Sequence, residues 1–110
     1  MITDEEVEKA ISWLRDNAKK AGIVAAQREH MDEWLKVEKA RLMGLFVGLS
    51  NAAAEAEALR HTAYMDAVNA RDTAIAADVE MRWLKSAAEA KIECWRTMSS
   101  NLRAEGKAYK

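Results

Sequence analysis

Residues 62–104 read TAYMDAVNARDTAIAADVEMRWLKSAAEAKIECWRTMSSNLRA, and this stretch decides the fold. The chain has no proline, and no glycine lies between Gly48 and Gly106, so nothing in the stretch is expected to stop a helix. A helix of that length is roughly 65 Å long. A compact monomer of 110 residues has a diameter of only about 26–30 Å. The sequence therefore predicts a helix that extends beyond its own domain and needs a partner along part of its length.

The apolar side chains of this stretch change face halfway along it when successive residues are placed about 100° apart. Those of the first half share one sector, which holds Tyr64, Val68, Ile75, Val79 and Trp83. Those of the second half lie nearly opposite, in a sector that holds Met81, Leu84, Ala88, Ile92, Trp95, Met98 and Leu102. A helix with two buried sides contacts two neighbours. We expect these to be the preceding helices of the same chain and a second copy of the protein.

The predicted core and oligomer interface therefore consist of Trp83, Leu84, Ala88, Ile92, Trp95, Met98 and Leu102. The alternative interpretation is a break near residue 80 that folds the stretch into a helical hairpin. No glycine, proline or asparagine lies there, which favours one continuous helix. We expect self-association into a homodimer or a homotetramer.

Residues 1–43 are expected to form two helices. Thr3 and Glu6 have the spacing of a capping box, in which each side chain accepts a backbone N–H left free at the helix start. Apolar residues then recur at intervals of three and four as far as Ala18. Gly22 is placed to end this first helix. The predicted helices span residues 3–21 and 23–43.

Residues 44–50, GLFVGLS, are the best candidate for a loop, although their composition is unusually apolar. We expect their side chains to pack over a core or a partner. Ser50 suits the N-cap of a short helix over residues 51–59, and Thr62 suits that of the long helix over residues 62–104. The prediction is one all-α domain over residues 1–110, a small helical bundle with a long C-terminal helix that oligomerises through helix packing.

The charge of the chain is nearly balanced, with 17 Lys and Arg against 18 Asp and Glu. This excludes a strongly basic nucleic-acid binder and an acidic mimic of nucleic acid. The charge is also uneven, because residues 1–10 carry a net −3 and residues 81–110 a net +4. No stretch approaches the roughly 20 apolar residues of a membrane span, and no signal peptide is visible. We therefore expect a cytoplasmic protein with no membrane partner.

The basic C-terminal segment could contact phosphates, and its candidate nucleic-acid-binding residues are Lys91, Arg96, Arg103 and Lys107. Trp95 lies beside Arg96 and could stack on bases. The competing interpretation is that the cations complement the helix dipole and that the tryptophans anchor a core or an interface. Trp13 lies off the apolar stripe of the first helix, which makes it a candidate interface residue.

No pattern predicts catalysis, a metal or a cofactor. Cys94 is the only cysteine and has no paired histidine, so nucleophilic catalysis is not expected. His30 beside Glu29 and Glu33 is a weak metal signal that helix surfaces generate freely. His61 suits a local hydrogen bond at a helix joint. We expect a protein that is not an enzyme and that has no catalytic residue, metal or cofactor.

Three stretches in combination resemble a family of short, all-helical proteins of tailed bacteriophages, encoded near replication and recombination genes. They are WLRDNAKKAG at 13–22, WLKVEKARLMG at 34–44 and RWLKSAAEAKIECWRTMSSNLRAE at 82–105. The strongest part is IECWR at 92–96 with Asn101, Arg103 and Ala104, where the family tends to carry a small residue in place of Cys94. The resemblance covers most of the chain. It implies a phage source and a role near DNA metabolism, but no reaction, because the family has no settled activity.

We therefore expect a non-enzymatic accessory protein for phage DNA recombination or replication in the host bacterial cytoplasm. Its expected partners are a phage recombinase, a host nuclease or helicase, or single-stranded DNA. One alternative is a phage-encoded inhibitor of a host defence or nuclease complex. The other is a structural helper in virion assembly.

Overall fold

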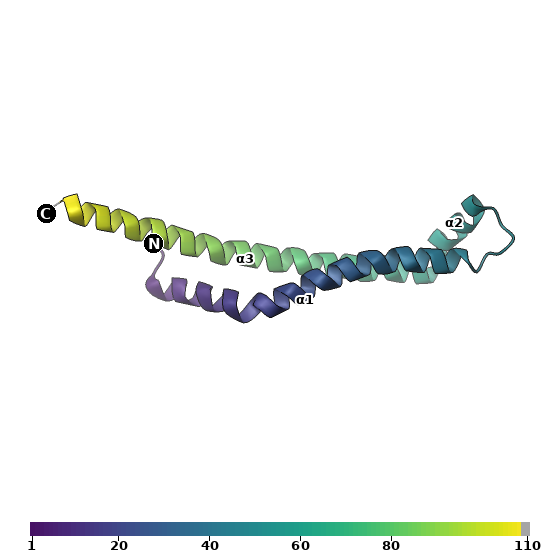
Figure 1. The fold of residues 1–110 in the computed structure, drawn as a ribbon, viewed down its shortest axis with the longest axis horizontal. Coiled ribbons are helices and arrows are strands. Elements are labelled where there is room, and N and C mark those ends of the chain that lie inside the picture. The colour runs from purple at the N-terminus through teal and green to yellow at the C-terminus, as the bar shows by residue number, and fades with distance from the viewer. Residues whose placement is uncertain (109–110) are drawn as a thin grey trace. The chain divides into compact units, whose positions relative to one another are not determined.

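The computed structural model of the chain describes residues 1–108, which form three α-helices and no strand (Figure 1). Helix α1 spans Asp4–Met43, α2 spans Asn51–Arg60 and α3 spans Thr62–Ala108. The predicted all-α class with a long C-terminal helix is confirmed. The stretch around residue 80 is continuous helix, so the alternative hairpin break is wrong.

Helix α1 passes through Gly22 without interruption, so the predicted break between residues 21 and 23 is wrong. A glycine inside a helix costs only about 1 kcal/mol relative to alanine. The residues on both sides of Gly22 continue one buried face of α1, which outweighs that cost. Its φ is not positive, so Gly22 does not act as a left-handed C-cap.

The helix starts are fixed by local hydrogen bonds. Thr3 and Glu6 form the predicted capping box, with Glu6 N–H donating to Thr3 Oγ1 at 3.1 Å and Thr3 N–H donating to Glu6 Oε2 at 3.3 Å. Ser50 Oγ accepts from the N–H of Ala53 at 3.2 Å and caps α2. The predicted cap for α3 is wrong by one residue, because His61 rather than Thr62 supplies it.

Contacts within the chain group into two compact units, and the expectation of one domain over residues 1–110 stays a prediction. Unit 1 combines Met1–Ala21 with the part of α3 from Glu80 onward, and unit 2 is Gly22–Val79. Long helices that lie antiparallel contact each other only at matching levels, so their contacts are local along the axis. Each long helix therefore contributes one part to each unit.

Both long helices carry a buried seam with the seven-residue repeat of a coiled coil, spaced alternately by three and four residues. The α1 seam is buried or half-buried throughout and comprises Val7, Ala10, Leu14, Asn17, Ala21, Val24, Arg28, Met31, Leu35, Glu38 and Leu42. The α3 seam is exposed only at Lys85 and Leu102 and comprises Tyr64, Ala67, Arg71, Ala74, Asp78, Met81, Lys85, Ala88, Ile92, Trp95, Ser99 and Leu102.

The predicted change of face along α3 is wrong. A stripe that repeats every 3.5 residues drifts by about 20° per heptad when it is placed on an ideal 3.6-residue helix. From Tyr64 to Leu102 this drift accumulates to about 110° and produces an apparent switch. Val79 and Trp83, assigned to the first sector, are exposed. Because the chain's own α1 covers the α3 seam within each unit, the seam does not require a second copy.

The core of unit 1 is small and apolar. Val7, Ala10, Met81 and Ala88 are buried. The two helices lie antiparallel here, since Trp95 Nε1 donates to Asp4 Oδ1 at 2.7 Å while Ala10 and Ala88 line one groove farther along α1. Alanine at facing seam positions lets two helix backbones approach closely.

The core of unit 2 combines small apolar side chains with buried charge. Its buried apolar residues are Leu35, Leu42, Ala54, Ala58, Ala67 and Ala74. Asp78 is only 2% exposed, and its Oδ2 accepts from Arg28 Nη1 at 3.0 Å. Arg28 and Asp78 stand at seam positions of α1 and α3, so this ion pair lies inside the packed face of the unit.

Glu38 is the second buried carboxylate of unit 2. Arg41 donates from Nε to both of its oxygens, at 3.2 and 3.1 Å. This hydrogen bonding holds the pKa of Glu38 below its ordinary value, against the opposing effect of burial, and the charges of Arg41 and His61 act in the same direction. Glu38 in turn raises the pKa of Arg41. The charged pair therefore stabilises the folded unit at neutral pH.

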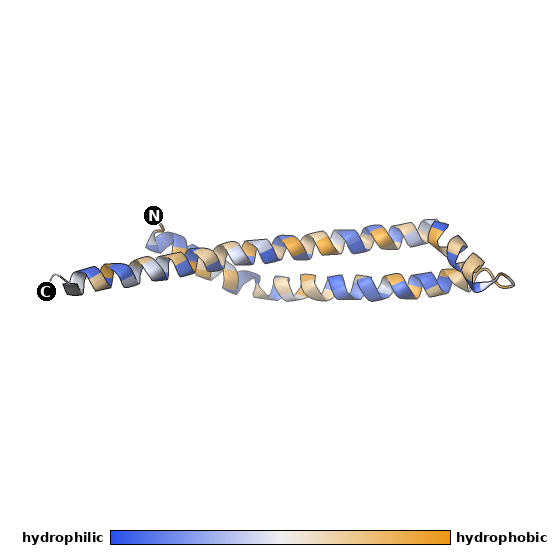
Figure 2. Ribbon diagram, turned by 90° about the horizontal axis from the view of Figure 1, so that it is seen from above, coloured by the Kyte–Doolittle hydropathy of each residue, from blue (hydrophilic) through white to orange (hydrophobic). Residues whose placement is uncertain are grey.

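Hydrophilic and hydrophobic residues are interleaved along α1 and α3 (Figure 2). Within the described residues, no helix has a long enough apolar run to cross a lipid bilayer.

Candidate functional surfaces

The loop between α1 and α2, residues 44–50, exposes large apolar side chains. Leu45 is 59% exposed, Val47 is 91% exposed and Leu49 is 50% exposed. The expectation that these side chains pack over a core of the same chain is therefore wrong. The short connection directs three of them away from unit 2, since only Phe46 of the four large side chains is half-buried.

The backbone of this loop is held by successive turns. Leu45 N–H donates to the Leu42 carbonyl and Phe46 N–H to the Met43 carbonyl, each at 3.1 Å, and Leu49 N–H donates to the Phe46 carbonyl at 3.3 Å. Gly48 has a φ of 96°, a conformation that side-chain-bearing residues rarely adopt. The loop therefore presents its exposed side chains on a defined frame. We call Leu45, Val47 and Leu49 the loop patch.

A groove of about 290 Å³ lies between α1 and α3 in unit 1. Its walls are mostly apolar, and its rim carries charged side chains; the lining residues are Glu6, Lys9, Ala10, Trp13, Leu84, Ala87, Ala88 and Lys91. Trp13 is half-buried and also borders a second hollow, of about 330 Å³, at the seam near Met81. Lys85 lines that hollow, where its polar side chain replaces an apolar seam residue.

One exposed stripe along α3 in unit 1 is almost free of charge, although other exposed positions of the same part of the helix, such as Arg82, Glu89 and Arg96, are charged. Eight exposed positions, spaced by three and four residues, form what we call the outer stripe: Glu80, Trp83, Ala87, Ala90, Cys94, Thr97, Asn101 and Ala104. Glu80 is its only charged member, and Trp83 is 74% exposed. Solvent-facing stripes of helices usually carry charged residues.

The structure places the predicted core residues in three environments. Ala88 is buried, and Ile92, Trp95 and Met98 are half-buried. Trp83, Leu84 and Leu102 are exposed, so they do not belong to the core of the single chain, and the prediction that they lie in an oligomer interface stays a prediction. The first two lie off the α3 seam, and Leu102 lies beyond the level at which Asp4 begins α1.

The predicted nucleic-acid-binding residues do not share one face. Arg96 and Arg103 are seven residues apart, on one side of α3, and both are exposed. Lys91 is five residues before Arg96, which places it about 140° away around the helix, and it lines the groove instead. The Lys107 side chain lies outside the part of the chain that is described.

The two clustered arginines also have local partners. Arg96 Nη1 lies 3.3 Å from Glu93 Oε2. Arg103 Nε donates to the Ser99 carbonyl at 3.4 Å. Both contacts are exposed, and exposed ion pairs contribute little to stability. The guanidinium groups can therefore exchange these contacts for another anion at little cost.

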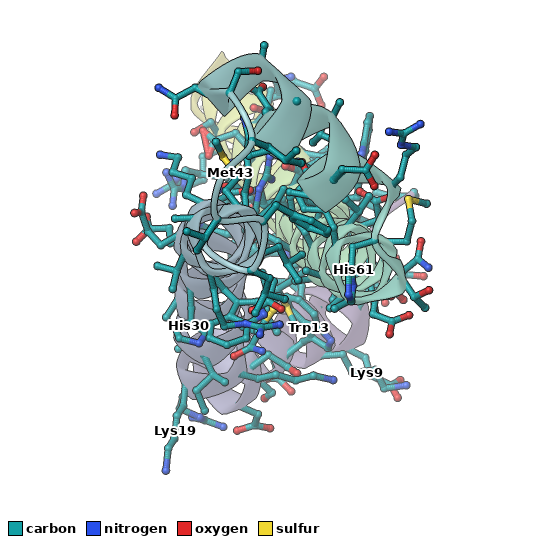
Figure 3. The ribbon with its side chains drawn as sticks, turned by 90° about the vertical axis from the view of Figure 1, so that its right-hand side faces the viewer. Lys9, Trp13, Lys19, His30, Met43 and His61 are labelled. Carbon is teal, nitrogen blue, oxygen red and sulfur yellow. The ribbon has the colours of Figure 1, made fainter. Side chains whose placement is uncertain are left out.

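His61 forms the local hydrogen bond expected of it, because its Nδ1 accepts from the N–H of Ala63 at 3.1 Å where α3 begins (Figure 3). In the described part of the chain, no group of three histidine, cysteine or acidic side chains is placed to hold a metal ion. Cys94 is exposed and is not in a disulfide.

Neither protein-family models, nor curated proteins, nor solved structures give a match to this chain.

Of the two environments expected for the loop patch, a core of the same chain is wrong, and a partner stays a prediction. Sectors of large apolar residues do not predict the outer stripe, because Trp83 is its only large apolar member. The available signal was the near absence of charge at intervals of three and four residues, in a chain of which 32% is charged.

Proposed function

We propose that the protein is a non-enzymatic accessory protein of a tailed bacteriophage, acting in DNA recombination or replication in the host bacterial cytoplasm by binding another protein. The loop patch is the observation that supports a binding role. The phage setting and the DNA-metabolism setting come from the sequence resemblance. The proposed partners are a phage recombinase and a host nuclease or helicase.

The loop patch has the properties of a protein-binding surface. Three large apolar side chains lie within five residues, and they project from a backbone fixed by turns. Full burial by a partner would contribute about 1.5–3 kcal/mol for the almost fully exposed Val47, and about half as much for each of the half-exposed Leu45 and Leu49. Because the loop is already ordered, little conformational entropy opposes binding. A contiguous exposed apolar patch of this kind typically marks an interaction site.

Affinity capture from phage-infected bacteria tests this proposal. The tagged chain is compared with a double variant, Leu45→Ser/Val47→Ser, and with Ile23→Ser as the matched control, since Ile23 is an exposed apolar residue of α1 outside the loop. We expect a recombination or replication protein to be retained by the unmodified chain and by Ile23→Ser, and to be lost with the double variant.

The identity of the captured protein separates the proposal from its alternatives. Loss of a capsid or tail protein with the loop variant would favour a role in virion assembly, and loss of a host defence complex would favour an inhibitor. Equal capture by all three chains would remove the loop patch from the proposal.

A second candidate function is binding of single-stranded DNA by α3. The supporting observation is that Arg96 and Arg103 lie exposed on the same side of the helix, within a segment of net positive charge. Binding would weaken steeply as the salt concentration rises, since each neutralised phosphate releases counterions. An Arg96→Ala/Arg103→Ala variant should lose gel-shift activity on a single-stranded oligonucleotide, while Lys91→Ala should keep it. If both chains shift the oligonucleotide equally, the paired arginines are not the site.

A further inference from the structure

Two exposed stripes of unit 1, one on each long helix, differ in charge. On α1, a stripe with the same spacing of three and four residues is mostly charged, and all of its members but the half-buried Ser12 are exposed; it comprises Glu5, Lys9, Ser12, Asp16 and Lys19. The outer stripe of α3 has one charged residue in eight positions. The α1 stripe therefore has the composition of a solvent-exposed helix surface. The outer stripe has the composition of a helix contact, and each of its members is exposed in the described part of the chain.

We propose that the outer stripe is the interface of a two-fold homodimer, in which Trp83 of each copy enters a hole in the stripe of the other copy. The hole is formed by Ala87, Ala90, Lys91 and Cys94. These residues have the i, i+3, i+4, i+7 spacing of a coiled-coil hole, and all but Lys91 are small. The expected partner of the outer stripe is a second copy of the chain, because the same short face carries both the projecting Trp83 side chain and the hole that can receive it.

The register follows from the spacing along α3. In an antiparallel pair of α3 helices related by a two-fold axis at Ala87, Trp83 of one copy lies level with residue 91 of the other. That level is within the hole defined above, and the symmetry fills both holes at once. Such a self-complementary patch is the requirement for a closed two-fold dimer. Alanine at positions 87 and 90 allows the helix axes to approach to about 8 Å.

The groove beside the stripe supports the same arrangement. Ala87 and Lys91 belong both to the hole and to the groove of about 290 Å³, so the surface around the hole is recessed. Leu84, next to Trp83, is exposed on the groove wall and supplies further apolar contact area. The Lys91 ammonium forms no ion pair in the described chain, and it can lie against the indole ring of the incoming Trp83 as a cation–π contact.

The mass of the protein in solution tests the proposal. The 12.3 kDa chain should have twice this mass by sedimentation equilibrium at high concentration and should dissociate on dilution, over a range of roughly 1–500 µM. Trp83→Ala should weaken the dimer at least 10-fold. Leu102→Ala is the matched control, since Leu102 is 58% exposed on the same helix but outside the stripe, and it should leave the dimer intact. Because Trp83 is exposed, its replacement should not unfold the chain.

Disulfide trapping tests the register independently. In a Cys94→Ser background, Ala87→Cys places two thiols at the two-fold axis, and mild oxidation should link the copies covalently. Glu89→Cys lies on another side of α3 and should not link them. The native Cys94 residues of the two copies would be about 21 Å apart along the axis, so the unmodified chain should not link either.

Several outcomes would overturn the proposal. A monomer throughout the concentration range would do so, as would a dimer unaffected by Trp83→Ala. Efficient linking through Cys94, with none through residue 87, would exclude this register. Loss of oligonucleotide binding on Trp83→Ala, in a chain that is always monomeric, would assign the tryptophan to base stacking instead. The loop variant Leu45→Ser/Val47→Ser should remain dimeric, so a failure of partner capture is distinguishable from a failure of dimerisation.

Discussion

Arg28 Nη1 lies 3.0 Å from Asp78 Oδ2, and both residues occupy seam positions where coiled coils usually have apolar side chains. Ala67 and Ala74 are the nearest small seam residues of α3 in unit 2, and alanine packs similarly in several registers. If one of the two helices slid along the other by one helical turn, Arg28 and Asp78 would be separated, and both charges would still lie in the poorly solvated seam. The ion pair therefore selects one antiparallel register within unit 2.

Removing one member of this pair should be more harmful than removing both. Asp78→Ala leaves the half-buried Arg28 without its carboxylate, and we expect a loss of about 3 kcal/mol, since breaking a buried pair typically costs 3–5 kcal/mol. The double variant Arg28→Met/Asp78→Leu replaces the pair by apolar packing and should recover most of that loss. Urea denaturation followed by circular dichroism measures both. A double variant no more stable than Asp78→Ala would show that the pair has no apolar substitute.

The Glu38–Arg41 pair predicts a specific dependence of stability on pH. Hydrogen bonding from Arg41 lowers the folded-state pKa of Glu38 below its ordinary value of 4.5. A carboxyl with a depressed folded-state pKa stabilises the fold above its unfolded-state pKa, and this contribution is lost as the pH falls through the folded-state value. The unmodified chain should therefore exceed Glu38→Gln in stability at neutral pH, and the difference should shrink below about pH 4.5.

Urea denaturation at a series of pH values measures this difference. Arg41→Met removes the main cause of the shift and should abolish the same pH-dependent component as Glu38→Gln. A difference between the unmodified chain and Glu38→Gln that is constant down to the acid limit would contradict the lowered pKa.

Gly22 and Gly48 should respond oppositely to alanine. Gly22 lies inside α1, and a Cβ added there would meet no atom within 4 Å. Gly22→Ala should stabilise the chain by about 1 kcal/mol. Gly48 has a φ of 96°, so Gly48→Ala should destabilise it by about 1–2 kcal/mol. The midpoints of thermal unfolding for the two variants should move in opposite directions, and each variant is the matched control for the other.

The helices could be predicted because their signals are local. The Thr3–Glu6 capping box, the Ser50 cap and the absence of proline each act within a few residues. The helix end expected at Gly22 is wrong because a local rule cannot weigh one glycine against a buried face that continues on both sides of it. The cap at His61 was missed because an imidazole nitrogen is an uncommon acceptor at a helix start.

The environment of the functional surfaces could not be predicted because it depends on the period of the seam. A repeat of 3.5 rather than 3.6 residues changes which side of α3 is buried near Trp83 and Trp95. That period becomes evident only when α1 is known to be one helix that accompanies α3. The exposure of Val47 depends on where unit 2 ends, and no residue near it in the sequence carries that information.

The hydrogen bond from Trp95 Nε1 to Asp4 Oδ1 ties the first turn of α1 to α3, across 91 residues of sequence. Trp95→Phe keeps most of the ring packing and removes this bond, at an expected cost of about 1 kcal/mol. Asp4→Ala removes the same bond from the other side. The two losses should not add in the double variant, because one shared contact accounts for both.

Trp95→Ala should cost about 2 kcal/mol, less than the 3–5 kcal/mol typical of a fully buried tryptophan, because its side chain is half-buried at the end of unit 1. Amide hydrogen exchange locates this loss of stability along the chain. Amides in residues 4–14 should exchange faster in Trp95→Ala, while amides around Leu35 should keep their protection. Fully additive effects of Trp95→Phe and Asp4→Ala, or uniform loss of protection along α1, would show that this contact does not hold the helix end.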